Sequence, residues 1–283
     1  MEVLACAKLN LTLDVLGKRP DGYHDMKMVM QSITLSDALT LTPNDGKGLR
    51  VASNLGFLPA DRSNLAAVAA LRYWQARNCP EEDLDIRIQK RIPVCAGMAG
   101  GSSDAAAVLR ALNERDGNPL TPAQLARVGE SVGSDVPYCV LGGTALAEGR
   151  GEILTSLPAL PQCWVVVCKP DFAISTPELF RQIDSVRLRC RPDTAGVLHA
   201  LEAGDLEGVA RRMYNVFEDV LPERQRARVA EIKSVLIQRG ALGATMSGTG
   251  PTAFGLFREE QQAKSAAALL SENYQETFLC QTV

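Results

Sequence analysis

The sequence predicts an α+β fold with two domains. Stretches with strand periodicity and stretches with helical periodicity occur in both halves of the 283-residue chain, without the regular strand–helix alternation of a doubly wound sheet. The length suits one large domain or two modest ones. The proline-rich segment 157–162 is the best candidate boundary, so we expect an N-terminal domain over residues 1–157 and a C-terminal domain over residues 158–283.

The N-terminal half indicates strands before helices. Leu9, Leu11, Leu13 and Val15 alternate with polar residues, as in a strand with one buried face. The segment 18–25 (KRPDGYHD) has the composition of a turn. The elements expected after it are returning strands over 26–43, a helix over 63–78 capped by Ser63 or Asn64, a strand over 84–94, helices over 103–113 and 122–131, and strand and turn segments over 142–158.

The C-terminal half mixes the same two kinds of element. The apolar run 163–170 (CWVVVCKP) predicts a buried strand. The elements expected after it are a helix over 176–184, mostly helical structure over 194–239, two short strands around a glycine turn over 243–257, a helix over 259–272 and a closing strand over 277–283. No internal repeat or low-complexity segment interrupts them.

Composition and charge argue against several classes of partner. The net charge of −3 at pH 7 gives no electrostatic reason to expect binding to nucleic acid or to an anionic membrane. The arginines of segment 187–191 are interpreted as a solvated surface. No apolar run approaches the ~18 residues of a spanning helix, and residues 1–15 lack the pattern of a signal peptide.

The eight cysteines predict reduced core residues in a cytoplasmic protein. None of them forms a CxxC pair, and neither His24 nor His199 lies at metal-ligand spacing from a cysteine. Several cysteines stand in apolar surroundings, where a thiol packs as a small hydrophobic group. A structural zinc site is therefore not expected.

A segment almost without side chains precedes the predicted helix at 103–113. In PVCAGMAGGSSDAAAVL (93–109), Gly97, Gly100 and Gly101 lie just before two serines. The first N–H groups of a helix lack partners and carry partial positive charge, and glycine lets the backbone approach a phosphate closely. The segment therefore predicts a phosphate-binding loop, with a plain tight turn before an alanine-packed helix as the alternative.

Neither of the two commonest phosphate loops fits this segment. A Walker A loop ends in Gly-Lys-Ser/Thr, and no such tripeptide follows here. A dinucleotide fingerprint needs G-x-G-x-x-G and an acidic residue on the tip of the next strand, whereas GMAGG lacks that spacing and residues 114–124 show no strand pattern.

Three segments together resemble the signatures of the GHMP small-molecule kinases. They are ACAKLNLTLDVLGKRPDGYHDM (5–26), the glycine loop PVCAGMAGGSSDAAAVL (93–109) and GATMSGTGPTAFGLF (243–257). Four shorter segments, AKLNLTLDVLGKRPDGYHDM (7–26), GSDVPYC (133–139), STPELF (175–180) and NVFE (215–218), resemble the members of the family that act on 4-diphosphocytidyl-2-C-methyl-D-erythritol. The likeness extends over nearly the whole chain.

The resemblance implies a fold and a nucleotide site. It implies a two-domain GHMP kinase fold, with an N-terminal domain like ribosomal protein S5 domain 2, a ferredoxin-like C-terminal domain and an active site in the cleft between them. It also implies that ATP is bound through its phosphates on the glycine loop. The residues assigned to ATP in this way are Pro93, Val94, Cys95, Ala96, Gly97, Met98, Ala99, Gly100, Gly101, Ser102 and Ser103.

The resemblance also implies the reaction, which is transfer of the γ-phosphoryl group of ATP to the 2-hydroxyl of the methylerythritol unit. Such a transfer needs alignment, charge neutralisation and a base for the hydroxyl proton. Asp135 matches the family's base, and Lys8 matches the lysine that keeps this base ionised and stabilises developing charge. From spacing alone, Asp135 as a cap of the turn before Pro137 and Lys8 as a solvated strand residue would be the favoured interpretations, and the family resemblance reverses this preference.

The substrate residues are carried over in the same way. Tyr23 matches a position that stacks on cytosine, His24 one that meets the base edge, and Phe180 the opposing aromatic. Thr176 is a nearby polar contact, and Asn10 matches a contact to the methylerythritol hydroxyls. The alternatives are turn residues for Tyr23 and His24, and an apolar helix face for Phe180.

The remaining expectations concern metal, partners and neighbouring functions. We expect Mg²⁺ held mainly by ATP oxygens, Ser103 and water, and a third signature, Ser247–Thr252, that supports the glycine loop. The partners are small molecules, with no nucleic acid or membrane, and the protein is a monomer or a homodimer. The alternatives are a GHMP kinase for another alcohol, such as homoserine or a mevalonate derivative, and a nonenzymatic nucleotide-binding protein of the same fold.

Overall fold

The computed structural model describes residues 1–283 and divides into two compact units. The first unit comprises Met1–Ala7, Ser36–Ile92 and Ala99–Gly142, and the second comprises Lys8–Leu35, Pro93–Met98 and Gly143–Val283. Neither unit is continuous in sequence, because the chain enters each of them several times. The long strands β1 (Glu2–Lys18) and β2 (His24–Pro43) contribute residues to both.

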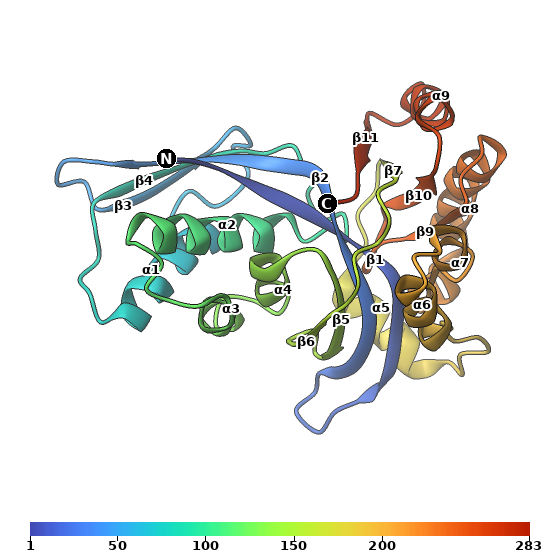
Figure 1. Cartoon of the computed structure of the whole chain (residues 1–283), viewed down its shortest axis with the longest axis horizontal. Helices are drawn as coiled ribbons and strands as arrows, with labels where there is room; N and C mark the ends of the chain where they lie inside the picture. Colours follow the sequence, from blue (N-terminus) through green and yellow to red (C-terminus); the bar gives the residue numbers. More distant parts are fainter. The chain divides into compact units, whose positions relative to one another are not determined.

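In the first unit, a sheet is covered by helices. The second half of β2 pairs antiparallel with β4 (Leu84–Gln89), and β3 (Leu49–Ser53) runs parallel to β4. Figure 1 shows α1 and α2 side by side next to these strands. The helices of this unit are α1 (Leu65–Arg77), α2 (Gly100–Arg115), α3 (Pro122–Glu130) and α4 (Val136–Leu141).

Small residues let α1 and α2 pack closely. The buried face of α1 contains four alanines together with Tyr73 and Trp74, and α2 buries the run Ala105–Ala107. Asn64 caps α1, since its Oδ1 accepts a hydrogen bond from the N–H of Ala66 at 3.0 Å. The start of α2 differs, because Ala99 at its N-cap position provides no side-chain cap.

In the second unit, a four-stranded antiparallel sheet has the order β11 (Glu276–Gln281), β7 (Trp164–Lys169), β10 (Ala253–Phe257) and β9 (Gly243–Met246). Its core strand is β7, in which Val165–Cys168 is buried between two partner strands. The helices α8 (Glu223–Gln238) and α9 (Glu260–Ser271) pack against this sheet (Figure 1).

The rest of the second unit is built around the second part of β1 and the first part of β2. Strand β2 pairs with β5 (Thr144–Gly149), which pairs with β6 (Ile153–Ser156). Strand β1 pairs in parallel with the two-residue β8 (Tyr214–Asn215), with Thr12 opposite Tyr214. The connecting helices are α5 (Thr176–Ser185), α6 (Thr194–Glu202), α7 (Leu206–Ala210) and the 3₁₀ helix Val216–Val220.

The α+β class is confirmed, and most predicted elements are present. Residues 26–43 belong to one strand that begins at His24, and the strand predicted over 84–94 ends at Gln89. Three short elements, β3, α4 and β8, were not predicted from the sequence. Segment 157–162 lies between β6 and β7 outside regular structure, and the domain boundary placed there stays a prediction.

The structure also bears on the predictions that the cysteines are core residues and that no helix spans a membrane. Cys139, Cys163, Cys168 and Cys280 are buried, as their apolar neighbours predicted, whereas Cys95 and Cys190 are exposed. His199 is exposed on α6. None of the helices combines the length and the apolar character that crossing a bilayer requires.

Candidate active site

The middle of the glycine loop, Pro93–Met98, packs against the third signature within the second unit. Gly97 has φ +73°, and a Cβ on it would lie 2.1 Å from the Ser247 carbonyl oxygen. The hydroxyl of Ser247 donates to the Gly97 carbonyl at 2.9 Å. Only glycine satisfies both the conformation and this close approach, which explains why the loop needs it here.

The end of the loop leaves the start of α2 open. Ala99 adopts the left-handed conformation (φ +57°) and Cys95 does so too (φ +53°), a backbone state that is uncommon for residues other than glycine. The first N–H with a helical acceptor is that of Ser103, which donates to the Ala99 carbonyl at 2.8 Å. The first turn also lacks an acidic residue, so the earlier amides, from Gly100 to Ser102, and the helix dipole are available to an anion.

The two serines of the loop differ in exposure. Ser102 is half-buried, whereas Ser103 is 1% exposed and its Oγ lies 3.5 Å from the Cys139 sulfur. No group of three or more His, Cys, Asp or Glu side chains is placed to hold a metal ion. Ser103 offers a hydroxyl oxygen, a ligand type that Mg²⁺ accepts, in the first turn of α2.

Lys8 and Asn10 lie next to each other on β1. The Lys8 ammonium donates to Asn10 Oδ1 at 2.7 Å, and the Lys8 N–H donates to the Met98 carbonyl of the loop at 3.2 Å. Asn10 is fully buried, and its Nδ2 faces the sulfur of Met28 at 3.4 Å. Lys8 is thus not a solvated strand residue, and Asn10 holds its ammonium in place.

Asp135 occupies the N-cap position of α4. Its carboxylate makes no capping hydrogen bond to the helix, although the helix begins directly after it and has Pro137 in its first turn. The interpretation of Asp135 as a simple cap is therefore wrong. The two residues predicted to be catalytic belong to different units, Lys8 to the second and Asp135 to the first.

Three of the predicted substrate residues cluster in the second unit. The ring of His24, at the start of β2, stacks on Phe180 of α5 with centroids 4.5 Å apart. Phe180 also meets Phe217 edge-on at 5.1 Å. Tyr23 is 56% exposed, and the Arg150 guanidinium lies over its ring at 5.1 Å from the centroid. The turn thus presents an aromatic face beside a buried histidine.

Two hydrogen bonds fix the surroundings of this cluster. His24 Nε2 lies 2.7 Å from Asp184 Oδ1, and this bond is the main cause that lowers the pKa of Asp184. Thr176 Oγ1 lies 2.9 Å from Thr249 Oγ1, which joins the start of α5 to the third signature. The direct contacts predicted for His24, Phe180 and Thr176 with a cytidine group stay predictions.

Sequence reasoning missed the residues that hold the third signature. Asn215 is buried, and its Nδ2 donates to the carbonyls of Met246 and Gly248, both at 2.8 Å. Glu218 Oε1 accepts from Thr245 Oγ1 at 2.7 Å and from the Met246 N–H at 2.8 Å. The segment NVFE was singled out only through the family resemblance, because nothing in its spacing indicates these bonds.

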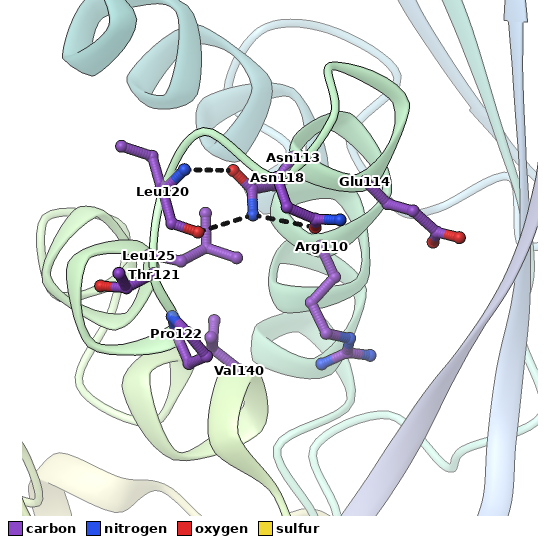
Figure 2. A pocket seen from close by; sticks show the side chains of 9 residues that line it. All are labelled: Arg110, Asn113, Glu114, Asn118, Leu120, Thr121, Pro122, Leu125 and Val140. Atoms are coloured by element: carbon purple, nitrogen blue, oxygen red, sulfur yellow. Dashed lines mark hydrogen bonds between the residues drawn. The ribbon is translucent and has the colours of Figure 1, made fainter.

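A separate cavity of ≈ 560 Å³ lies in the first unit between α2, α3 and α4 (Figure 2). None of the predicted site residues lines it. In its wall, Asn113 is hydrogen-bonded to the backbone of Leu120, and the Arg110 guanidinium donates to the carbonyls of Cys139 and Leu4. These polar groups hydrogen-bond to backbone carbonyls and amides of the protein itself. Because its lining contains none of the predicted site residues, the cavity is distinct from the candidate active site.

The chain is similar to known proteins over most of its length. Residues 64–143 match the family model described as GHMP kinases N terminal domain, and residues 197–276 match that of GHMP kinases C terminal. The 4-diphosphocytidyl-2-C-methyl-D-erythritol kinase of Alkaliphilus metalliredigens is 44% identical over 276 residues, which cover 98% of this chain and 94% of the relative.

Two solved structures resemble the chain over its whole length. A crystal structure of 4-(cytidine 5′-diphospho)-2C-methyl-D-erythritol kinase superimposes with a TM-score of 0.83 at 33% identity, covering 100% of this chain and 99% of that one. A homoserine kinase from Cytophaga hutchinsonii superimposes with a TM-score of 0.76 at 19% identity, covering 100% of this chain and 94% of that one. The second similarity, at that identity, concerns the fold alone.

Proposed function

Because the chain belongs to the GHMP kinases, and within them to the family of 4-diphosphocytidyl-2-C-methyl-D-erythritol kinases, we propose that it transfers the γ-phosphoryl group of ATP to the 2-hydroxyl of 4-diphosphocytidyl-2-C-methyl-D-erythritol. ATP binding is supported chiefly by the start of α2, where no side chain caps the first backbone amides. The glycine loop leads directly into this helix, and the Ser247 hydroxyl holds the loop through the Gly97 carbonyl. The names of the relatives support the identity of the acceptor.

ATP lies with its phosphates along Pro93–Ser103, where the first-turn amides of α2 and the helix dipole balance negative charge. Mg²⁺ accompanies ATP and supplies charge neutralisation when bound. Ser103 is the proposed protein ligand of the metal, through a side chain that lies against Cys139 in this structure. The loop leaves space for the triphosphate because its residues have so little side chain.

Asp135 accepts the proton of the 2-hydroxyl as the new P–O bond forms. Lys8 stabilises the charge that develops during transfer, and Asn10 keeps the Lys8 ammonium pointing in one direction through a 2.7 Å hydrogen bond. Since little covalent chemistry is needed, positioning and electrostatics account for most of the catalysis.

Tyr23 stacks on the cytosine, and His24, Phe180 and Thr176 complete the nucleoside site. The exposure of the Tyr23 ring and the closeness of His24 and Phe180 support this assignment. Asn10 contributes to binding of the methylerythritol group. The substrates are small molecules, and we propose a cytoplasmic enzyme that acts as a monomer or a homodimer.

The test is ADP release in a coupled assay with Mg·ATP and one of three acceptors: the cytidylyl substrate, homoserine or mevalonate. Turnover is expected with the first acceptor alone. Phosphorus NMR of the product should show one new phosphomonoester in addition to the intact diphosphate. Preferred turnover of homoserine or mevalonate, or no turnover with any acceptor, would contradict the proposal.

A further inference from the structure

Three buried charged side chains meet at the two ends of the ATP loop. Asp37 on β2 is 0% exposed, Lys90 just after β4 is 8% exposed, and Asp104 on α2 is 4% exposed. All three belong to the first unit, which also contains Ile92 and Ala99, the residues that flank the loop's middle segment. We call Asp37, Lys90 and Asp104 the loop clamp.

The clamp fixes the chain where the loop begins. Asp37 Oδ1 accepts hydrogen bonds from the N–H groups of Arg91 (2.5 Å) and Ile92 (2.8 Å), and Ile92 is the last residue before Pro93. The Lys90 ammonium donates to Asp37 Oδ2. Two successive backbone amides and one side chain are therefore held by a single buried carboxylate.

The same ammonium fixes the helix that follows the loop. Lys90 Nζ donates to Asp104 Oδ2, in the first turns of α2, at 2.7 Å. A Cβ on Gly100 would lie 3.3 Å from Lys90 Nζ and 3.2 Å from Ile92 Cγ2, so the first turn of α2 rests on both residues. Lys90 thus connects Asp37, which holds Ile92 just before the loop, with α2, which begins just after the loop.

Net stability is a poor explanation for such a cluster. Removing charges from water costs several kcal/mol per ion, so buried ion pairs contribute little compared with apolar residues of the same size, and in some proteins their role is to specify one geometry. Asp104 Oδ1 is buried without a hydrogen-bond partner, a further unfavourable feature. The geometry that this cluster specifies is the separation and orientation of the two ends of the loop.

We propose that Asp37, Lys90 and Asp104 are positioning residues that hold the ends of the glycine loop so that the first-turn amides of α2 are presented to the triphosphate in one arrangement. The inference rests on the proposed function, since it assumes that ATP binds this loop. The three side chains do not contact ATP themselves. The Lys90 ammonium is bound to the Asp37 and Asp104 carboxyl groups and contributes by fixing the positions of these two side chains.

The decisive variant is Asp104→Ala, which removes the anchor on α2 and leaves the Lys90–Asp37 pair intact. Losing a charge-assisted hydrogen bond should raise KM for ATP about tenfold, while KM for the cytidylyl substrate stays within about twofold of wild type. Asp104→Asn keeps an acceptor for Lys90 and should restore most of the ATP affinity. A purely structural role would not separate the two KM values or give this rescue.

Asn113→Ala is the matched control. Asn113 lies on the same helix, is also buried, and bonds the backbone of Leu120 at the far end from the loop. This variant should lower the melting temperature at least as much as Asp104→Ala and leave KM for ATP unchanged. An equal rise in KM for ATP in both variants, or none in Asp104→Ala, would overturn the clamp.

Calorimetric binding of a non-hydrolysable ATP analogue separates this inference from the proposed function. If wild type binds the analogue and Asp104→Ala weakens binding about tenfold, the clamp stands even if the cytidylyl substrate is not turned over. If wild type turns over that substrate and Asp104→Ala binds the analogue normally, the proposed function stands and the clamp fails. No binding by wild type would overturn both.

Discussion

Ser247 and Gly97, which are 150 positions apart in the sequence, share a hydrogen bond of 2.9 Å from the serine hydroxyl to the glycine carbonyl. The same hydroxyl accepts the N–H of Asn10 on β1 at 3.2 Å. One oxygen therefore joins the ATP loop to the strand that carries Lys8. The third signature acts here as a support for the loop, as the family resemblance implied.

Replacing Ser247 by alanine should raise KM for ATP about fivefold, because a net hydrogen bond is worth about 1 kcal/mol and the loop loses its link to β1. Steady-state kinetics with ATP varied gives the value. Ser271→Ala removes an exposed hydroxyl that donates to the Ala268 carbonyl at 2.8 Å, and it is the control that should leave KM unchanged. An unchanged KM in Ser247→Ala would mean that Gly97 does not need this support.

Asp135→Asn should lower kcat by two orders of magnitude or more, since a positioned base contributes about 10²–10⁴-fold. ATP affinity should stay within a few fold. Helix α4 should stay formed in this variant, because the carboxylate makes no capping hydrogen bond to it. Single-turnover rates of the variant with ATP varied provide both values. Turnover close to wild type would remove Asp135 from the mechanism.

Lys8→Ala should lower kcat to a similar extent but also lower the melting temperature. This loss of stability is expected because Lys8 is buried and its removal leaves Asn10 Oδ1 without a donor. Binding of ATP to the folded variant, measured by calorimetry below its melting temperature, should remain within a few fold of wild type. A variant that turns over normally would exclude Lys8 as a catalytic residue.

Tyr23→Ala should raise KM for the cytidylyl substrate roughly 5- to 150-fold, the value expected for loss of one base–aromatic stacking contact. KM for ATP should hardly change, and Tyr23→Phe should lose far less because the ring remains. The melting temperature should fall little, since the ring is largely exposed. If Tyr23→Ala weakens ATP as much as the cytidylyl substrate, the pyrimidine site lies elsewhere.

The buried thiols predict a pH limit to stability. Burial raises the pKa of Cys163 to about 11 and the pKa values of Cys168 and Cys280 to about 12. Since these thiols are neutral when folded and ionise more easily when unfolded, their contribution to stability is complete below pH ~9 and is lost as the pH rises toward these values. The melting temperature should fall progressively above pH ~9.

The same burial predicts which thiols react in the folded protein. At pH ~8, iodoacetamide should label the exposed Cys95 and Cys190 and spare Cys163, Cys168 and Cys280, as mass spectrometry of the digested protein can show. Saturating ATP should slow labelling of Cys95, which lies in the loop, but not of Cys190. Early labelling of Cys168 would contradict its burial in the sheet.

Chelation tests the proposed metal. EDTA should abolish turnover, and excess Mg²⁺ should restore it, because the ion accompanies ATP and no protein cage competes for it. Reducing agent should leave activity unchanged. Restoration by zinc but not by magnesium would refute the assignment.

The sequence predicted what depends on local patterns. The alternation at Leu9–Val15 predicted a strand and Asn64 predicted a helix cap, and both are present. The expectation of one buried face on that strand is wrong, because Lys8, Asn10, Thr12 and Asp14 on its polar face are buried too. Strand β8 was missed because its two residues become a strand only by pairing with Thr12 and Leu13. Helix α4 was missed because six residues carry too little periodicity.

The site shows the same division. Strand periodicity puts Lys8 and Asn10 on one face of β1, but no spacing rule predicts that Asp184 bonds His24 or that Asp37, Lys90 and Asp104 meet. These contacts join segments up to 160 positions apart in the case of His24 and Asp184. They depend on tertiary packing, which propensity and periodicity do not encode.

The parallel pairing of Thr12 with Tyr214 bears on how the chain acquires its structure during synthesis. A ribosome that has completed β1 must add about 200 more residues before β8 exists, which takes roughly 10–40 s at ~5–20 residues per second. Throughout that interval β1 has no β8 edge partner, and the sheet formed by β7 with β9, β10 and β11 cannot assemble either, since β9–β11 are translated later still. The edge of β1 at Thr12 and Leu13 therefore stays without this partner until about three quarters of the chain has been made.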